Sequence, residues 1–200
     1  GAASDSHASS WDFVNGDVDL GVLPAGGPSG GSFANAINFD GSVIVGTSTH
    51  TLANHAVRWT NGVIADIHGV AGEYSEAFGV NYAGDVIVGS ADFTAGATTN
   101  LHAFRWTAGA GMQSVEQWLT DNDVNVGALS TKEAHGVNKD GSMVVGMLSN
   151  NEAFVARVGS TGSGLIALDE LNKSISAGIS GVGGSMVSAS TVINGAHSRP

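Results

Sequence analysis

Four positions of the chain carry the same short signature and could together bind a metal. An imidazole precedes alanine at His7, His55 and His102, and Glu152 stands at the corresponding place in a fourth copy. Equivalent positions of a repeat occupy equivalent places in the fold, so three imidazoles and a carboxylate could face one common axis. That donor set suits zinc or a similar divalent ion. The alternative is that each histidine bonds to a backbone group of its own unit.

An arginine–tryptophan pair ends the same motif in two of the copies. The pairs are Arg58-Trp59 and Arg105-Trp106, and Trp11 stands at the same spacing after the first histidine. We expect the indole rings to pack in the core or between units, because they recur with the repeat. The arginines either pair with a carboxylate or a ring of the next unit, or form a repeated ligand-binding position together with Trp59 and Trp106.

No catalytic signature accompanies these residues. The chain contains no G-x-S-x-G, H-E-x-x-H or phosphate-loop motif, so a binding role is favoured over an enzymatic one. The acidic run from Asp121 to Gly127 resembles the start of a calcium loop, but its twelfth position is Lys132, where an EF-hand needs glutamate. We therefore expect this run to be a solvated loop.

A second element recurs in phase with the first and indicates the fold. Asn38, Asn81 and Asn138 each begin the pattern N-x-x-G-x-[VM]-[IV]-V-G. Each unit then contains four short strands: one ending at the asparagine, the valine-rich run, the histidine-to-tryptophan segment and one more. This predicts an all-β repeat over residues 7–158, with about three and a half antiparallel four-stranded units, either propeller-like or a β-solenoid.

Two segments depart from the repeat. The spacing of apolar residues between Met112 and Leu119 predicts one short helix inserted between the second and third units. Residues 159–200 form a tail that we expect to be helical or flexible. Its apolar residues are spaced three or four apart, and glycines weaken that helix: Leu168, Leu171, Ile175, Ile179, Val182 and Met186.

Composition narrows the range of partners. The chain has seven basic and 18 acidic residues, which gives a net charge of −11 and argues against a nucleic-acid partner. The chain has no cysteine, so disulfides, thiolate zinc sites and cysteine nucleophiles are excluded. No apolar stretch approaches the roughly 18–20 residues of a membrane-spanning helix.

The His102-Ala103-Phe104 motif and the N-x-x-G-x-V-V-G element together resemble the HAF-repeat family of extracellular bacterial proteins. The tail ending Asn194-Gly195-Ala196-His197 resembles the linker that joins an autotransporter passenger to its β-barrel. This resemblance implies an exported passenger, displayed on the bacterial outer-membrane surface or released, and carries no catalytic residues to this chain. We expect it to bind an extracellular protein or glycan in an adhesin-like or effector-like manner. The alternatives are a secreted hydrolase with a site assembled across repeats and a self-associating structural protein.

Overall fold

The computed structural model describes residues 6–51, 53–95, 100–128, 130–158 and 164–167. The chain divides into two compact units, residues 1–165 and 166–200. The stripe predicted from Leu168 to Met186 lies outside the described residues, and the domain boundary after residue 158 stays a prediction. No helix in the described part of the chain is long and apolar enough to cross a membrane.

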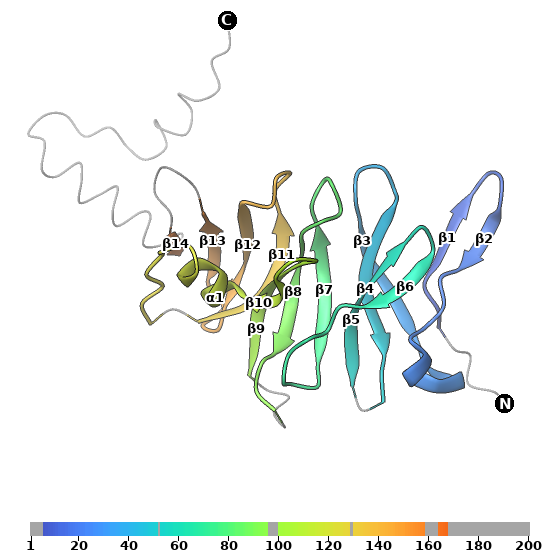
Figure 1. Ribbon diagram of the computed structural model, residues 1–200, viewed down its shortest axis with the longest axis horizontal. Helices are drawn as coiled ribbons and strands as arrows, with labels where there is room; N and C mark the ends of the chain where they lie inside the picture. Colours follow the sequence, from blue (N-terminus) through green and yellow to red (C-terminus); the bar gives the residue numbers. More distant parts are fainter. Residues whose placement is uncertain (1–5, 52, 96–99, 129, 159–163, 168–200) are drawn as a thin grey trace, which may run out of the picture. The chain divides into compact units, whose positions relative to one another are not determined.

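Four antiparallel sheets follow one another in chain order (Figure 1). Sheet 1 is a hairpin of β1 (Ser9–Asp12) and β2 (Gly16–Asp19), and a 3-10 helix, η1 (Pro24–Ser29), follows it. Sheet 2 contains β3 (Ser32–Ile37), β4 (Val43–Thr49), β5 (Asn54–Thr60) and β6 (Val63–Asp66). Sheet 3 contains β7 (Ser75–Val80), β8 (Ile87–Asp92), β9 (Leu101–Thr107) and β10 (Gly111–Ser114). Sheet 4 contains β11 (Thr131–Val137), β12 (Met143–Leu148), β13 (Ala153–Arg157) and β14 (Gly164–Ala167).

Strands pair with their chain neighbours in every sheet, so each four-stranded sheet is a simple meander. The predicted all-β repeat of antiparallel four-stranded units is confirmed. Sheet 1 supplies the half unit, because β1 and β2 correspond to the third and fourth strands of the other sheets.

The asparagine of each unit closes the first turn in the same way. Its side-chain oxygen accepts a hydrogen bond from the backbone N–H five residues later, at 2.9 Å for Asn38, 3.0 Å for Asn81 and 2.9 Å for Asn138. The third residue after it is a glycine whose backbone φ is positive, a conformation that residues with a side chain rarely adopt. These glycines are Gly41, Gly84 and Gly141. The recurring N-x-x-G pattern therefore encodes one turn, as predicted.

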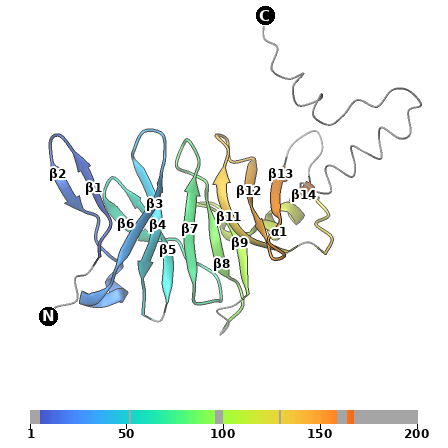
Figure 2. The ribbon, with the colours of Figure 1, turned by 180° about the vertical axis from the view of Figure 1, so that it is seen from behind.

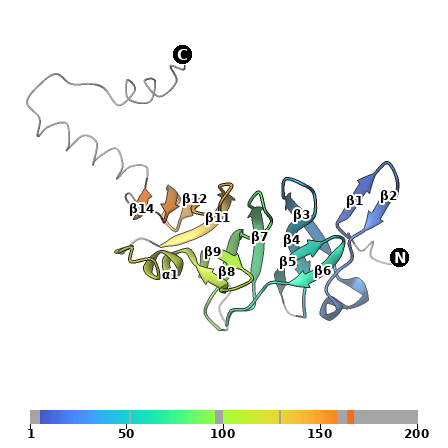
Figure 3. The ribbon, with the colours of Figure 1, turned by 45° about the horizontal axis from the view of Figure 1, so that its top comes forward.

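Neighbouring sheets contact each other through the first strand of the later sheet. Strand β7 lies against β3, β4 and β5, and β11 lies against β7, β8 and β9 (Figures 2 and 3). The turn glycine of the later sheet lies close against a valine of the earlier one. A Cβ on Gly84 would lie 2.6 Å from Val43 Cγ2, and one on Gly141 would lie 2.5 Å from Val86 Cγ2. The same contact thus joins sheets 2 and 3 and sheets 3 and 4.

The apolar core fills the spaces between sheets. One cluster lies between sheets 2 and 3 and includes Val45, Ile87 and Phe104, all fully buried. A second cluster joins sheets 1 and 2 around Trp59, whose indole N–H donates to Leu20 O at 2.8 Å. Burial of large side chains between sheets, rather than within one sheet, is what makes the array stable.

The inserted helix is shorter than predicted and begins later. Helix α1 spans Val115–Thr120, whereas Met112 belongs to β10 and pairs with Trp106 of β9. The fourth strand of sheet 3 therefore takes the first half of the predicted helix. Ser114 makes the transition, because its hydroxyl accepts a hydrogen bond from Gln117 N and caps α1.

Candidate functional site

The histidines of the repeat do not converge on a common site. Each bonds to a carboxylate of its own unit: His7 to Asp19 at 2.8 Å, His55 to Asp66 at 2.8 Å and His102 to Glu116, on helix α1, at 3.5 Å. Glu152 accepts a hydrogen bond from Asn150 at 2.9 Å. The predicted four-residue metal set is therefore not assembled. The physical reason is that the third strand pairs with the fourth strand of its own sheet, while equivalent positions lie on separate sheets.

The alanine of the same motif links one sheet to the next. The amide of Ala8 donates to Ser32 Oγ at 3.0 Å, and that of Ala56 donates to Ser75 Oγ at 2.9 Å. Both serines are buried and begin the first strand of the following sheet. In these two copies the His-Ala motif is thus a structural element: the histidine bonds to the fourth strand of its own sheet, and the alanine bonds to the first strand of the next sheet.

The predicted binding arginines stack on rings. The guanidinium of Arg58 lies 5.7 Å from the ring centre of Trp106 in the next sheet. Arg105 lies 5.0 Å from the ring centre of Trp118, on the inserted helix, and its Nε donates to Gly141 O of sheet 4 at 3.3 Å. These contacts link neighbouring sheets, which is the structural alternative given for the arginines above.

The tryptophans of the repeat differ in burial. Trp59 is fully buried and Trp106 is partly buried beside Arg58. Trp11 is 66% exposed and meets Phe13 edge-on at 5.1 Å, so the expectation that it packs in the core is wrong. Trp59 is covered by the hairpin of sheet 1, whereas among the described residues no sheet precedes Trp11.

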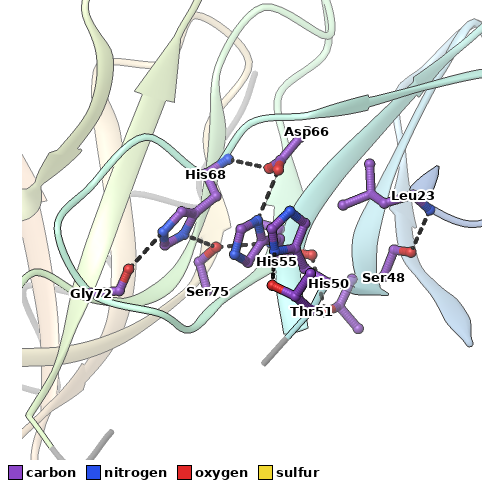
Figure 4. A network of polar contacts seen from close by, with 11 residues as sticks. Leu23, Ser48, His50, Thr51, His55, Asp66, His68, Gly72 and Ser75 are labelled. Atoms are coloured by element: carbon purple, nitrogen blue, oxygen red, sulfur yellow. Dashed lines mark hydrogen bonds and ion pairs between the residues drawn. The ribbon is translucent and has the colours of Figure 1, made fainter. Parts of the chain in front are cut away.

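Three imidazoles form a column at one end of sheet 2 (Figure 4). His50 stacks on His55 with ring centres 4.0 Å apart, and His55 stacks on His68 at 4.1 Å. His50 follows the end of β4, His55 stands near the start of β5, and His68 follows the end of β6. These strands are adjacent and antiparallel, so all three histidines lie at the same end of the sheet.

Asp66 and Ser75 fix the column from its sides. The carboxylate of Asp66 bonds to His55 Nδ1 at 2.8 Å and accepts the backbone N–H of His68 at 2.8 Å. His68 Nε2 lies 2.9 Å from Gly72 O, which can only accept, so that nitrogen carries the proton. The hydroxyl of Ser75, 2.8 Å from Nδ1, then donates to the ring. Burial, followed by repulsion from His55, lowers the pKa of His68, which favours this neutral form.

A metal-ligand set is present at this column. Among the described residues, one cluster of histidine and carboxylate side chains has its ligand atoms within 4.8 Å of one another: His50, His55 and Asp66. Two nitrogens and one oxygen suit a late divalent transition metal. The sequence pointed to His55 but not to His50 or Asp66. The signal that could have found them is the strand register, which places the ends of β4 and β6 beside the start of β5.

The equivalent place in sheet 3 is a cavity instead of a column. A hollow of about 320 Å³ adjoins His102 and Glu116, with apolar walls from Phe93 and Met112. Gln113, Ser114 and Gln117 complete its lining.

His102 and Glu116 stabilise each other's charged forms beside this cavity. The hydrogen bond to Glu116 raises the pKa of His102, against the effect of burial. For Glu116, burial favours the neutral form, but hydrogen bonds from His102 and Thr131 outweigh it and lower the pKa. Both Thr131 N and Thr131 Oγ1 donate to the same oxygen, Glu116 Oε1. Glu116 therefore holds the start of sheet 4 as well as His102.

Comparisons with known proteins leave the function to be argued from this geometry. No protein-family model matches the chain, and no match is found among the curated proteins or the solved structures.

Proposed function

We propose that this chain is an extracellular binding module that recognises its partner on an apolar surface along the first strand of sheet 2. The observation that carries this proposal is the exposure of three large apolar side chains in a short stretch of chain. Phe33 is 56% exposed, Ile37 58% and Phe39 73%. Phe33 and Ile37 pair with Thr47 and Ile44, so they lie on the two faces of β3, which is an edge strand of sheet 2. Large exposed apolar side chains close together in the chain at such an edge mark a candidate interaction site.

The turns of the next two sheets extend this surface. Phe39 stacks on Tyr82 with ring centres 4.3 Å apart, and Lys139 Nζ lies 4.6 Å from the ring centre of Tyr82. These three residues each follow the asparagine of their own unit, so they form a row that crosses from sheet 2 to sheet 4. Aromatic residues and a cation at the surface of a rigid array favour recognition with little loss of side-chain entropy.

A protein is the favoured partner. The exposed phenylalanines and isoleucine offer apolar area that a protein partner can bury. A glycan instead needs a free aromatic face flanked by polar groups. Phe39 and Lys139 already contact the ring of Tyr82, so Tyr82 does not offer such a face. The net charge of −11 continues to disfavour nucleic acid. The HAF-repeat resemblance supports export to the outer-membrane surface, with an autotransporter β-barrel as the chain's own partner in a longer protein.

A secreted hydrolase is the second candidate, and the cavity beside His102 favours it. A histidine oriented by a carboxylate can act as a general base. However, the same pair occurs at His7 and His55, and Ser114 Oγ, the hydroxyl lining the cavity, already accepts from Gln117 N. Hydrolysis of ester or glycoside substrates that is abolished by His102→Ala would establish the enzyme. The absence of turnover by the wild type would exclude it for those substrates.

Binding to immobilised matrix proteins and to a glycan array tests the binding proposal. We expect saturable binding to a protein, weakened at least about tenfold by a Phe33→Ser, Ile37→Ser, Phe39→Ser triple variant. The matched control is Val63→Ser, because Val63 is 70% exposed on β6, at the opposite edge of the same sheet.

Three outcomes separate the alternatives. Equal binding by the triple variant and the wild type would contradict the proposed surface. Binding to glycans alone would change the partner class. Gel filtration that shows a dimer, lost in the triple variant, would identify a second copy of the chain as the partner.

A further inference from the structure

We propose that His50, His55 and Asp66 form a zinc site that ties together the ends of β4, β5 and β6. One ligand atom from each residue lies within 4.8 Å of the others. Two imidazoles and a carboxylate leave the fourth position of a tetrahedral zinc for water. The chain has no cysteine to compete for the ion.

Neighbouring groups hold two of the three ligands in place. His68 N donates to one oxygen of Asp66, and the Thr51 hydroxyl lies 3.2 Å from His50 Nδ1. Such outer contacts orient the ligands and commonly change metal affinity by about 10–100-fold. His68 itself is excluded as a ligand, because Gly72 O and Ser75 Oγ occupy both of its ring nitrogens.

The neighbouring repeat shows that this donor set is not simply the signature of the fold. Ser48 pairs with His55 and Ala91 pairs with His102, so the position of His50 corresponds to Phe93. Val57 pairs with Asp66 and Phe104 pairs with Ser114, so Ser114 stands in place of Asp66. The histidine of the His-Ala motif is kept in both sheets. The position of Asp66 is also aspartate in sheet 1, where Asp19 bonds to His7 at 2.8 Å. His50 is therefore the donor that distinguishes sheet 2 from both of these neighbours.

Zinc binding requires one local change. The planes of His50 and His55 lie only 12° apart, and an imidazole lone pair lies in the plane of its ring. Both nitrogens can reach one ion only if the rings tilt apart. His50 is half-buried on the turn after β4, so the proposal assigns this rotation to its side chain. The ion would also replace the proton between His55 Nδ1 and Asp66, which passes to solvent.

Calorimetric titration of the full 200-residue chain with zinc chloride tests the site, with cobalt absorption as a second readout of tetrahedral geometry. We expect one zinc per chain, a rise in the thermal midpoint that EDTA reverses, and no binding of calcium, which prefers more oxygen ligands. The chain should carry no affinity tag, so that no other histidines are added.

Two variants replace a proposed ligand with the residue that occupies the same position in sheet 3. His50→Phe should fold, because Phe93 occupies the same position there, and should weaken zinc binding more than about 100-fold. Asp66→Ser should do the same; if it does not fold, Asp66→Asn keeps the shape of the side chain. The control is His135→Phe, which removes an exposed histidine of sheet 4 and should leave zinc affinity unchanged.

Loss of binding in the sheet 2 variants but not in the control would support the site. No calorimetric heat and no cobalt band with the wild type at roughly millimolar metal would overturn it. Unchanged zinc affinity in His50→Phe would overturn it equally. Neither result depends on whether the apolar surface of sheet 2 binds a protein.

Discussion

Sheets 2 and 3 share one scaffold and surround its histidine differently. His55 and His102 both precede a buried alanine and both bond to a carboxylate near the end of the fourth strand. In sheet 2 the imidazole is sandwiched between two others, whereas in sheet 3 it borders a cavity. Both sheets thus keep the bond between histidine and carboxylate, but they differ in the residues that surround the imidazole ring. The variable positions are where function is best sought.

The largest expected difference concerns the tryptophans at equivalent positions. Trp59→Ala should cost about 3–5 kcal/mol of unfolding free energy, because the ring is fully buried and its N–H is bonded to Leu20 O. Trp106→Ala should cost about 1–2 kcal/mol, since its ring is only partly buried. Trp11→Ala should stay within about 0.5 kcal/mol. Chemical denaturation measures all three, and equal losses would refute the burial difference.

The turn glycines give the next largest difference. Gly41 and Gly84 share a φ of +78°, so alanine strains both turns equally, by about 1 kcal/mol. A Cβ on Gly41 would lie 3.8 Å from Ile37 Cδ1, an ordinary contact, whereas on Gly84 it would collide with Val43 of sheet 2. Gly84→Ala should therefore cost about 2–4 kcal/mol in total. Similar stabilities for Gly41→Ala and Gly84→Ala would mean that sheets 2 and 3 are not packed this closely.

Acid should separate the two histidine environments. The pKa of His68 is lowered, so its contribution to stability is present above the ordinary value of 6.5 and is lost as the pH falls. The pKa of His102 is raised, so its contribution is complete below 6.5 and is lost as the pH rises through the folded-state value. Titration of the ring protons by NMR should show His102 protonating at a higher pH than His68.

Glu116→Gln tests whether Glu116 is the cause of the raised pKa of His102. The pKa of His102 should fall, and the variant should lose about 1 kcal/mol more stability at about pH 5.5 than at about pH 8. An unchanged His102 titration would show that Glu116 is not the cause of the shift.

The smallest expected effect concerns the stacked arginines. Arg58→Lys and Arg105→Lys keep the charge but lose the flat stacking surface, worth about 0.5–1 kcal/mol. Arg105→Lys should be the more costly of the two, because Arg105 Nε also donates to Gly141 O. Thermal melts of the two variants would show which one loses more stability. A larger loss for Arg58→Lys would contradict a stabilising role for the hydrogen bond from Arg105 to Gly141 O.

Local chemistry made much of the fold predictable. The asparagine turn needs only residues within one short stretch, so Asn38, Asn81 and Asn138 identified the strands on either side. The cluster of His50, His55 and Asp66 could not be predicted in the same way, because His50 and Asp66 meet only through the register of three strands. The start of helix α1 was misplaced because Met112 fits a helical spacing and a strand position equally well, and its pairing with Trp106 decides between them.

The contact between Gly84 and Val43 is repeated between Gly141 and Val86. Sheet 3 therefore offers its turn glycine to the sheet before it and its valine to the sheet after it. A gene for such a chain can duplicate or delete one whole unit in frame and still produce matching faces at the new junction. Evolution can lengthen or shorten this protein by single units, and can equip each new copy with different residues beside its histidine.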